Sequence, residues 1–431
     1  MAHWRDLYRA KLTDAAAAAA RVHSGDTLAI PSCGAGPWRV LEALAKRPDV
    51  RGVRICHATL WGPMYHLKPE NAEKMRTLAL FLTANARKAM LDGRVDFVPV
   101  NLGHVAHLFH SGALPVDVAV LHLSPPDDEG YCTFGVYVAY MRAAAEAAKV
   151  VIAEVNDQMP RTYGDTRIHV SQLDAIVEVS ARLPEIPPGE STDIERRIGE
   201  HVAALVEDGA TLQLGRGGMP DAVLAFLGDK RDLGVHTELY SDTVVEMVKR
   251  GVITGARKTL HPGKLIAGFL DGSRKLYEFV DNNPMVEMHR SEYVNDPAVI
   301  GQNDKLVAIN SAVEVDLTGQ INAESVGTRL LSGAGGQLDF ALGAWRSKNG
   351  KFIIAMPSTA SQHSRIVARL GDGAAVTVPR TLAQFVVTEY GVADLRGASL
   401  NQRAKTLIAI AHPDHREALE RAARERSDLH I

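Results

Sequence analysis

Glu238 is the residue whose setting in the sequence most favours chemistry. It stands in segment 234–242 (G-V-H-T-E-L-Y-S-D), between two glycine-rich segments, 213–220 (Q-L-G-R-G-G-M-P) and 331–340 (L-S-G-A-G-G-Q-L-D-F). Glycine allows backbone N–H groups to come close to a negatively charged atom. One carboxylate with two amide-rich loops suggests acyl chemistry.

The position of Glu238 between two predicted elements supports this interpretation. Residues 233–237 should form a strand, and Ser241–Asp242 should open a helix. In an open α/β sheet, ligands bind beyond the carboxyl ends of the strands, which is where such a residue would lie. Glu324 and Glu389 also stand near glycines and are alternative loop carboxylates. From the residues alone, Glu238 is either a nucleophile or a hydrogen-bonded structural carboxylate.

Short apolar runs alternate with longer helical patterns along the chain. The segment 22–37 contains a short strand that enters a glycine-rich turn, and a helical pattern begins at Pro37. Further apolar runs lie at 53–58, 95–100, 117–123 and 150–155, with helical patterns such as 136–148 between them. This alternation predicts an α/β fold with a mostly parallel sheet that is flanked by helices.

The second half of the chain repeats the plan of the first. Four residues recur 184 positions later: Val22, Gly25, Thr27 and Leu28 as Val206, Gly209, Thr211 and Leu212. A later pair of segments, 118–130 and 307–319, also agrees. The repeat predicts two related α/β halves rather than one long domain.

The joint between the halves is visible in composition. Residues 183–192 (L-P-E-I-P-P-G-E-S-T) hold three prolines and a glycine. After them, Thr192 and Glu195 have the spacing of a capping box that opens a helix. A chain of 431 residues is also too long for one ordinary core. We therefore predict an N-terminal domain at 1–185 and a C-terminal domain at 190–431.

The composition of the chain bears on its binding partners and on its place in the cell. The chain is 46% hydrophobic and 23% charged, with a net charge of −3, which favours neither nucleic acid nor an anionic membrane surface as a partner. There is no run of about eighteen apolar residues, and the N-terminus has charges where a signal peptide needs an apolar segment. Three widely spaced cysteines fit reduced thiols. We expect a cytoplasmic protein.

Two other kinds of site are less consistent with the sequence. The loops at 34–37 and 215–220 lack the G-x-G-x-x-G spacing of dinucleotide-binding proteins. His104, His107 and His110 could lie along one side of a helix, but zinc hydrolases show tighter signatures and no acidic residue accompanies these three. Residues 127–129 follow two prolines and precede a glycine, which is typical of a turn. We expect no metal.

Motifs in order along nearly the whole chain resemble the acetyl-CoA hydrolase/transferase family, and within it the 4-hydroxybutyrate CoA-transferase branch. The motifs are S-P-P-D-D-E-G-Y (124–131), N-D-Q-M-P-R-T-Y-G (156–164), G-G-M-P (217–220), H-T-E-L-Y-S-D (236–242), T-L-H-P-G-K (259–264), L-T-G-Q-I-N-A-E-S-V-G (317–327), S-G-A-G-G-Q-L-D-F (332–340) and V-T-E-Y-G-V-A-D-L-R-G (387–397). Any one of these motifs is a weak signal, whereas their shared order and spacing are specific.

The resemblance implies two related CoA-transferase-type domains, a homodimer, and an enzyme that moves CoA between an acyl-CoA, such as acetyl-CoA, and a short-chain acid of the 4-hydroxybutyrate or butyrate type. It implies that Glu238 is the nucleophile and forms an acyl-glutamyl anhydride and then a glutamyl-CoA thioester. A carboxylate suits this role because it is ionised at pH 7 and needs no separate activating base.

The resemblance also assigns the remaining site residues. The expected oxyanion and orienting groups are Gly218, Met219, Gly336 and Asn322. The expected contacts to CoA are Gly215, Arg216, Gly217, Gly218, Met219, Ser332, Gly335, Gly336 and Lys348.

Two alternatives stay open at this point. Water in place of the second acid would make the same site an acyl-CoA hydrolase. A non-catalytic CoA-binding protein is the more distant alternative, since a pure binder needs no nucleophile.

Overall fold

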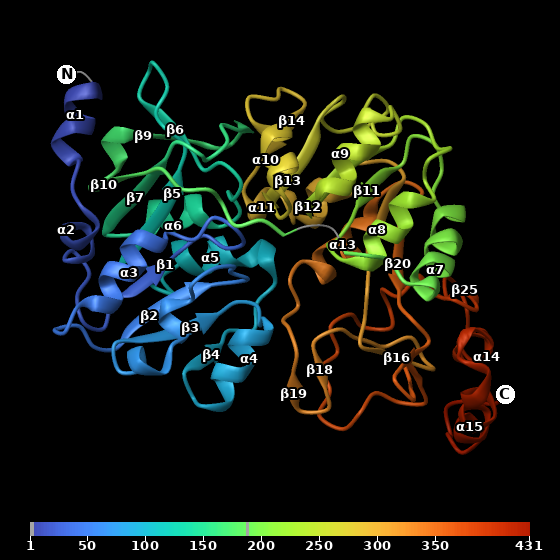
Figure 1. Cartoon of the computed structure of the whole chain (residues 1–431). Helices are drawn as coiled ribbons and strands as arrows, with labels where there is room; N and C mark the ends of the chain where they lie inside the picture. The colour runs from blue at the N-terminus through green and yellow to red at the C-terminus, as the bar shows by residue number, and fades with distance from the viewer. Residues whose placement is uncertain (1–3, 187–188) are drawn as a thin grey trace. The chain divides into compact units, whose positions relative to one another are not determined.

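The computed structural model describes residues 4–186 and 189–431. These residues divide into two compact units, 4–186 with Ile266–Val294, and 189–265 with Asn295–Ile431 (Figure 1). The segment Ile266–Val294, from the second half of the chain, thus belongs to the first unit. The predicted domains 1–185 and 190–431 stay a prediction, because compactness does not show which pieces fold alone.

The first unit is built on a seven-stranded parallel sheet in the order β10-β7-β5-β1-β2-β3-β4. In chain order the strands are β1 (Thr27–Ala29), β2 (Val53–His57), β3 (Met75–Ala79), β4 (Val95–Phe97), β5 (Val118–Leu123), β7 (Val150–Asn156) and β10 (Ala175–Val179). Every residue of β5 is buried, as expected for a strand that is covered on both faces. The predicted α/β class is confirmed.

Helices flank this sheet, with α6 packed on β5 and α2 on β10 (Figure 1). The helices of the first unit are α1 (Trp4–Lys11), α2 (Ala15–Ala19), α3 (Trp38–Lys46), α4 (Ala84–Leu91), α5 (Val105–His110), α6 (Met141–Ala147), α10 (Arg274–Val280) and α11 (Ser291–Val294). The smaller strands are β6 (Tyr131–Thr133), β8 (Tyr163–Gly164), β9 (Arg167–His169), β13 (Leu265–Leu270) and β14 (Val286–Met288). The segment Ile266–Val294 joins this unit partly through β14, which pairs in parallel with β8.

The second unit has a sheet in which β25, β24, β20, β15, β11 and β12 are neighbours in that order. Only the β25–β24 pair among these is antiparallel. The strands are β11 (Thr211–Gln213), β12 (Gly234–Tyr240), β15 (Leu306–Asn310), β20 (Lys351–Ala355), β24 (Phe385–Thr388) and β25 (Gly391–Asp394).

The helices of the second unit are α7 (Asp193–Ala204), α8 (Gly218–Ala225), α9 (Asp242–Lys249), α12 (Pro297–Ile300), α13 (Gln337–Arg346), α14 (Leu400–Ile410) and α15 (Pro413–Arg424). Short strands complete the unit: β16 (Glu314–Asp316), β17 (Ile321–Asn322), β18 (Ser325–Val326), β19 (Arg329–Leu330), β21 (Thr359–Ala360), β22 (His363–Ser364) and β23 (Ile366–Val367). The capping box predicted at Thr192 and Glu195 opens α7.

The sequence repeat corresponds to a structural repeat. In the first unit β1 lies between β5 and β2, and in the second β11 lies between β15 and β12. Even the register agrees, because Leu28 pairs with Val118 and the matching Leu212 pairs with Val307. The two related halves predicted from the 184-residue offset are confirmed at the level of these strands.

Glu154 is a buried carboxylate that the first unit uses to hold a helix. It stands on β7, is 1% exposed, and accepts a hydrogen bond from the Val40 backbone N–H at 2.8 Å. Val40 is in the first turn of α3, whose preceding residue, Pro37, provides no side-chain cap. Burial raises the pKa of Glu154 to about 7, while backbone hydrogen bonds from Val40 and Arg39 oppose the rise.

This pKa predicts a pH-dependent stability. The folded pKa lies above the unfolded one, so the contribution of Glu154 is complete below about pH 4.5 and is lost as the pH rises through 7. We expect Glu154→Gln to gain, relative to wild type, roughly 3 kcal/mol of unfolding free energy between pH 4.5 and pH 8. Urea unfolding of both proteins across this range measures the difference.

The exposed Glu70 provides the control. Glu70→Gln makes the same substitution at a carboxylate on the surface of the same unit. A Glu154→Gln difference that is constant with pH would contradict the titration and leave only a packing effect.

Candidate active site

Glu238 lies near the carboxyl end of β12, beside the parallel strand β11. Successive side chains of a strand point to opposite faces, so His236, Glu238 and Tyr240 share one face of β12. The ring of His236 is in edge contact with Phe340 of α13, with 6.4 Å between ring centroids. Glu238 therefore belongs to the face of β12 that meets helix α13.

Asn295 donates a hydrogen bond directly to the Glu238 carboxylate. The distance from Asn295 Nδ2 to Glu238 Oε1 is 2.9 Å, and the same nitrogen lies 3.2 Å from Asp339 Oδ2. Asn295 and Asp339 are buried, whereas Glu238 keeps some exposed surface. The nucleophile candidate is thus held by a buried amide, although residue 238 as a whole is only half-buried.

Gly336 approaches the same carboxylate so closely that no side chain fits. A Cβ atom at this position would lie 2.2 Å from Glu238 Oε1 and 2.0 Å from Asn295 Nδ2. Gly336 is also the residue that precedes α13. The first N–H groups of a helix have no partner within it and form its positive end. The close approach therefore places backbone donors near the carboxylate.

The pKa of Glu238 is raised to about 7, chiefly because the carboxyl group is buried. The hydrogen bond from Asn295 lowers it, and the charge of Asp339 raises it further. Ionised and neutral forms therefore coexist near neutral pH. The full ionisation at pH 7 that is expected from the ordinary pKa of a glutamate is corrected here: part of Glu238 is neutral at that pH, and only the ionised form can attack a carbonyl.

The two alternative glutamates have structural partners instead. Glu389 accepts hydrogen bonds from the Ser358 hydroxyl at 2.6 Å and from the Ser358 N–H at 2.9 Å. Glu324 Oε1 accepts a hydrogen bond from the Thr377 hydroxyl at 2.9 Å. Both carboxylates fasten neighbouring loops, and this role accounts for them without chemistry.

The first glycine-rich loop starts beside Glu238. The hydroxyl of Thr237 donates to the Leu214 carbonyl at 2.8 Å and accepts from the Leu214 N–H at 3.2 Å. Gly215, Arg216, Gly217, Gly218 and Met219 follow; of these, Arg216 is exposed and Met219 is buried. A Cβ on Gly218 would meet Glu195 at 2.8 Å. This loop thus emerges next to the site, while Gly218 itself packs on Glu195 of α7.

The other predicted residues are spread more widely. Gly335, with φ of 55°, directly precedes Gly336, and its role in the site stays a prediction. The Ser332 hydroxyl donates to the Ala323 carbonyl at 3.0 Å. Lys348 comes after the end of α13, and this helix of ten residues spans about 15 Å from its start at the site.

Asn322 is occupied with its own turn. Its Nδ2 donates to Glu314 Oε1 at 3.0 Å and to the Ser325 carbonyl at 2.8 Å, and its Oδ1 accepts from the N–H groups of Glu324 and Ser325. The predicted orienting role of Asn322 stays a prediction, and it would require one of these bonds to break.

Comparison with known proteins decides the family. The profile of the acetyl-CoA hydrolase/transferase N-terminal domain matches residues 2–184, and that of the C-terminal domain matches residues 272–423. The chain belongs to the acetyl-CoA hydrolase/transferase family. It is a CoA-transferase of this family and is similar to 4-hydroxybutyrate CoA-transferases.

Similar proteins match this chain over nearly its whole length. It is 49% identical to the 4-hydroxybutyrate coenzyme A transferase of Clostridium kluyveri, covering 96% of this chain and 98% of the relative. It is 37% identical to the butyryl-CoA:acetate CoA-transferase of Anaerostipes caccae, covering 96% of each. A crystal structure of 4-hydroxybutyrate CoA-transferase from Porphyromonas gingivalis, 42% identical, matches with a TM-score of 0.85 over 98% of this chain and all of that one.

Sequence reasoning missed two residues of this CoA-transferase site, Asn295 and Asp339. Asn295 is 57 positions from Glu238 and is followed by Asp296 and Pro297, so its local sequence predicts only the start of a helix. Asp339 lies inside a quoted motif, but its neighbours in sequence do not include the amide that it binds. Only the fold brings these residues to Glu238.

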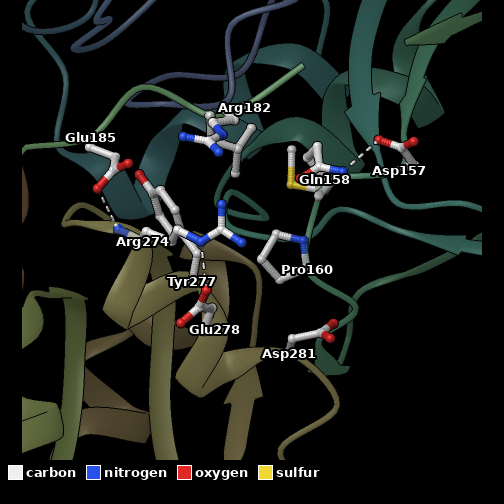
Figure 2. Close-up of a pocket in the computed structure, with 11 residues that line it drawn as sticks. Asp157, Gln158, Pro160, Arg182, Glu185, Arg274, Tyr277, Glu278 and Asp281 are labelled. Carbon is white, nitrogen blue, oxygen red and sulfur yellow. Dashed lines mark hydrogen bonds and ion pairs between the residues drawn. The ribbon is translucent and has the colours of Figure 1, made fainter. Parts of the chain in front are cut away.

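The first unit of this CoA-transferase has a separate surface pocket of about 260 Å³ (Figure 2). Its lining includes Arg182, Arg274, Glu185, Glu278 and Tyr277. Arg274 Nε already donates to Glu278 Oε1 at 2.6 Å, and the Tyr277 hydroxyl donates to the Pro184 carbonyl at 2.9 Å. The charged side chains that line this pocket are exposed. None of these lining carboxylates is fixed by a buried amide, as Glu238 is by Asn295.

Neither a metal centre nor a membrane span is found in residues 4–186 and 189–431. No cluster of three or more histidine, cysteine, aspartate or glutamate side chains in this range could hold a metal ion. No helix in the same range is long and apolar enough to cross a membrane.

Proposed function

We propose that Glu238 is the nucleophile of a CoA-transferase that moves CoA between acetyl-CoA or a similar acyl-CoA and a short-chain acid of the 4-hydroxybutyrate or butyrate type. The observation that carries the proposal is the Glu238 carboxylate itself, held by Asn295 against the start of α13 with a pKa of about 7. The relatives named for 4-hydroxybutyrate and butyryl-CoA support this class of acid.

The first half of the reaction transfers CoA to the enzyme. Ionised Glu238 attacks the acyl carbonyl carbon, the carbon–sulfur bond breaks, and CoA leaves as the thiolate, so that an acyl-glutamyl anhydride remains. The thiolate then attacks the glutamyl carbonyl, the anhydride bond breaks, and the first acid leaves as its carboxylate. The product is a glutamyl-CoA thioester.

The second half reverses these steps with the acceptor acid. Its carboxylate attacks the glutamyl thioester carbonyl and expels the thiolate, which gives a new anhydride. The thiolate attacks the acyl side of this anhydride, releasing the new acyl-CoA and ionised Glu238. No net proton or electron is exchanged, so the site needs neither a separate base nor a redox group.

Asn295 is suited to stabilise the attack on the glutamyl carbonyl. Negative charge then develops on a glutamyl oxygen, and Asn295 Nδ2 already lies 2.9 Å from Glu238 Oε1. Backbone N–H groups at Gly335 and Gly336 are the proposed donors for the acyl oxygen. One such donor contributes roughly 3–4 kcal/mol of transition-state stabilisation in other enzymes.

CoA itself is proposed to follow the glycine-rich loops. Residues 215–219 emerge beside Thr237, next to the nucleophile, and suit the pantetheine arm. Ser332, Gly335 and Gly336 suit its reactive end, while Lys348, about one helix length from Gly336, suits a more distant part of the cofactor.

Trapping the thioester tests this function. The pure protein is mixed with acetyl-CoA without acceptor acid, digested with trypsin and examined by mass spectrometry. We expect an adduct of CoA minus water on peptide 232–249, which contains Glu238. The adduct should disappear on addition of butyrate or 4-hydroxybutyrate, with formation of the matching acyl-CoA.

The same experiment separates the hydrolase alternative. Sustained consumption of acetyl-CoA without acceptor acid, well beyond one equivalent per enzyme, would indicate hydrolysis through the same glutamate. Transfer to butyrate with an adduct on a different peptide would reject Glu238 as the nucleophile.

A further inference from the structure

Asp339 is a second buried carboxylate beside the site, and neither the motif that contains it nor the reaction described above gives it a task. It is 2% exposed, stands in the first turn of α13, and its Oδ2 lies 3.2 Å from Asn295 Nδ2. We infer that Asp339 is a positioning residue that fixes the Asn295 amide so that its second N–H points at Glu238. This inference rests on the proposed role of Glu238.

The orientation of an amide between two carboxylates has one favourable solution. Asn295 Nδ2 has two hydrogens, and one is directed to Glu238 Oε1 and the other to Asp339 Oδ2. A flipped amide would turn Oδ1 toward both carboxylates, and an oxygen cannot donate to an ionised acid. Without Asp339, a single partner would leave the amide free to rotate away from Glu238.

Asn295 Oδ1 shows that this orientation is held against a local cost. The oxygen is buried and has no hydrogen-bond partner among the described residues. A buried acceptor without a donor is unfavourable, and rotation of the amide toward other groups would relieve it. The amide keeps both hydrogens on the carboxylates, which is the direction that serves the nucleophile.

Tight helix packing sets the distance between Asn295 and Asp339. Asn295 comes two residues before α12, and α12 packs closely on α13. A Cβ on Gly343 would meet Ile300 at 2.2 Å, and one on Gly301 would meet the Arg346 side chain at 2.6 Å. Such contacts leave little freedom for one helix to slide on the other, so the Asp339 carboxylate stays within reach of the amide.

Asp339 also gives the inference an electrostatic signature. Burial has the largest effect on the pKa of Glu238, and the negative charge of Asp339 raises this pKa further. Asn295 is neutral. His236 and Tyr240 are the titratable residues on the same face of β12, and Gln213 and Asn310, which end β11 and the next strand β15, carry neutral amides. Removal of the charge at 339 should therefore shift the ionisation of Glu238 to lower pH.

The test uses four variants of the full chain: Asp339→Asn, Asp339→Ala, Asn295→Ala and the double Asn295→Ala/Asp339→Ala. Single-turnover formation of the Glu238–CoA adduct is measured from pH 5 to pH 9, and melting temperatures check the fold. In wild type, the rate should rise with pH through about 7, as Glu238 ionises. Asp296→Asn is the control, because it removes a charge next to Asn295 and keeps an acceptor for the Ala298 N–H that caps α12.

The rise of the rate with pH is the acid limb of the profile. We expect Asp339→Asn to move this acid limb to lower pH, and Asp296→Asn to leave it in place. Asp339→Ala should lower the plateau rate roughly 10- to 100-fold, the range that misplacement of a reacting group produces. Because Asp339 acts through Asn295, the double variant should match Asn295→Ala within about twofold.

Two results would overturn the inference: an acid limb for Asp339→Asn identical to wild type, or a loss from Asp339→Ala that is as large without Asn295 as with it. If Asp339→Ala does not fold, the limb of the isosteric Asp339→Asn decides. Failure of the proposed function is recognised separately, because Glu238→Gln would then still transfer CoA.

Discussion

Glu238→Gln is expected to abolish CoA transfer, with kcat reduced by more than about 10⁴-fold, the scale seen when a covalent nucleophile is removed. Glutamine has nearly the same shape, and its carbonyl oxygen can still accept the hydrogen bond from Asn295. The fold should therefore persist, while the amide cannot attack a thioester. Transfer from acetyl-CoA to butyrate, together with the melting temperature, measures both statements.

Glu238→Asp sharpens the same prediction. Shortening the side chain by one methylene withdraws the carboxylate from both Asn295 and the acyl carbon, so turnover should be severely impaired although the charge remains. Wild-type-like turnover of this variant would argue against tight positioning of the nucleophile.

Glu389→Gln is the matched control, because it makes the same change at a carboxylate that accepts hydrogen bonds from Ser358 rather than from Asn295. The two carboxylate oxygens of Glu389 each accept one hydrogen bond from Ser358, and the glutamine amide keeps only one of these oxygens. The variant should therefore be less stable, while CoA transfer per folded molecule stays close to wild type. An equal loss of transfer in Glu389→Gln would remove the distinction between the two glutamates.

Local sequence was sufficient for the framework of the fold. β1 and β11 are short apolar segments with the same spacing of glycine and threonine, and the structure places both at matching positions in parallel sheets. The capping box at Thr192 fixes the start of α7 for the same local reason. Such features depend on neighbours within a few residues, and a sequence displays these neighbours directly.

Contacts between distant segments were not accessible in this way. The segment 266–294 joins the first unit although it follows the predicted joint by about eighty residues, because strand pairing such as β14 with β8 outweighs position in the chain. Asn295 and Asp339 belong to the same category. Their importance arises from atoms 2.9 Å and 3.2 Å apart, contributed by segments 44 or more positions from one another.

The site residues divide along the same line. Glu238 and Gly336 were predicted from a strand end and a glycine-rich motif, and the structure brings them into contact. Their catalytic roles stay predictions until the variants are measured. Asn322 carries a suitable amide in a suitable motif, yet this amide already bonds Glu314 of β16 and residues 324 and 325 of its own turn. Residue type alone cannot show whether a side chain is already occupied.

Gly336→Ala is expected to lower CoA transfer strongly, although it adds a single methyl group. The new Cβ would overlap Glu238 Oε1 at 2.2 Å and Asn295 Nδ2 at 2.0 Å, so either the carboxylate or the helix start must move. Displacement of a reacting group by about 1 Å can cost on the order of 100-fold, and we expect at least that loss in kcat. Steady-state transfer and the yield of the Glu238–CoA adduct measure it.

Gly371→Ala shows whether the effect comes from that contact. Its Cβ would have ordinary neighbours at 3.8–3.9 Å, so activity should stay within about twofold of wild type. If the overlap at Gly336 acts on the nucleophile, Gly336→Ala should lose the adduct and transfer together while it melts within a few degrees of wild type. A Gly336→Ala protein that forms the adduct at the wild-type rate would mean that the start of α13 can yield, and that Glu238 does not need the close packing on which the proposed mechanism depends.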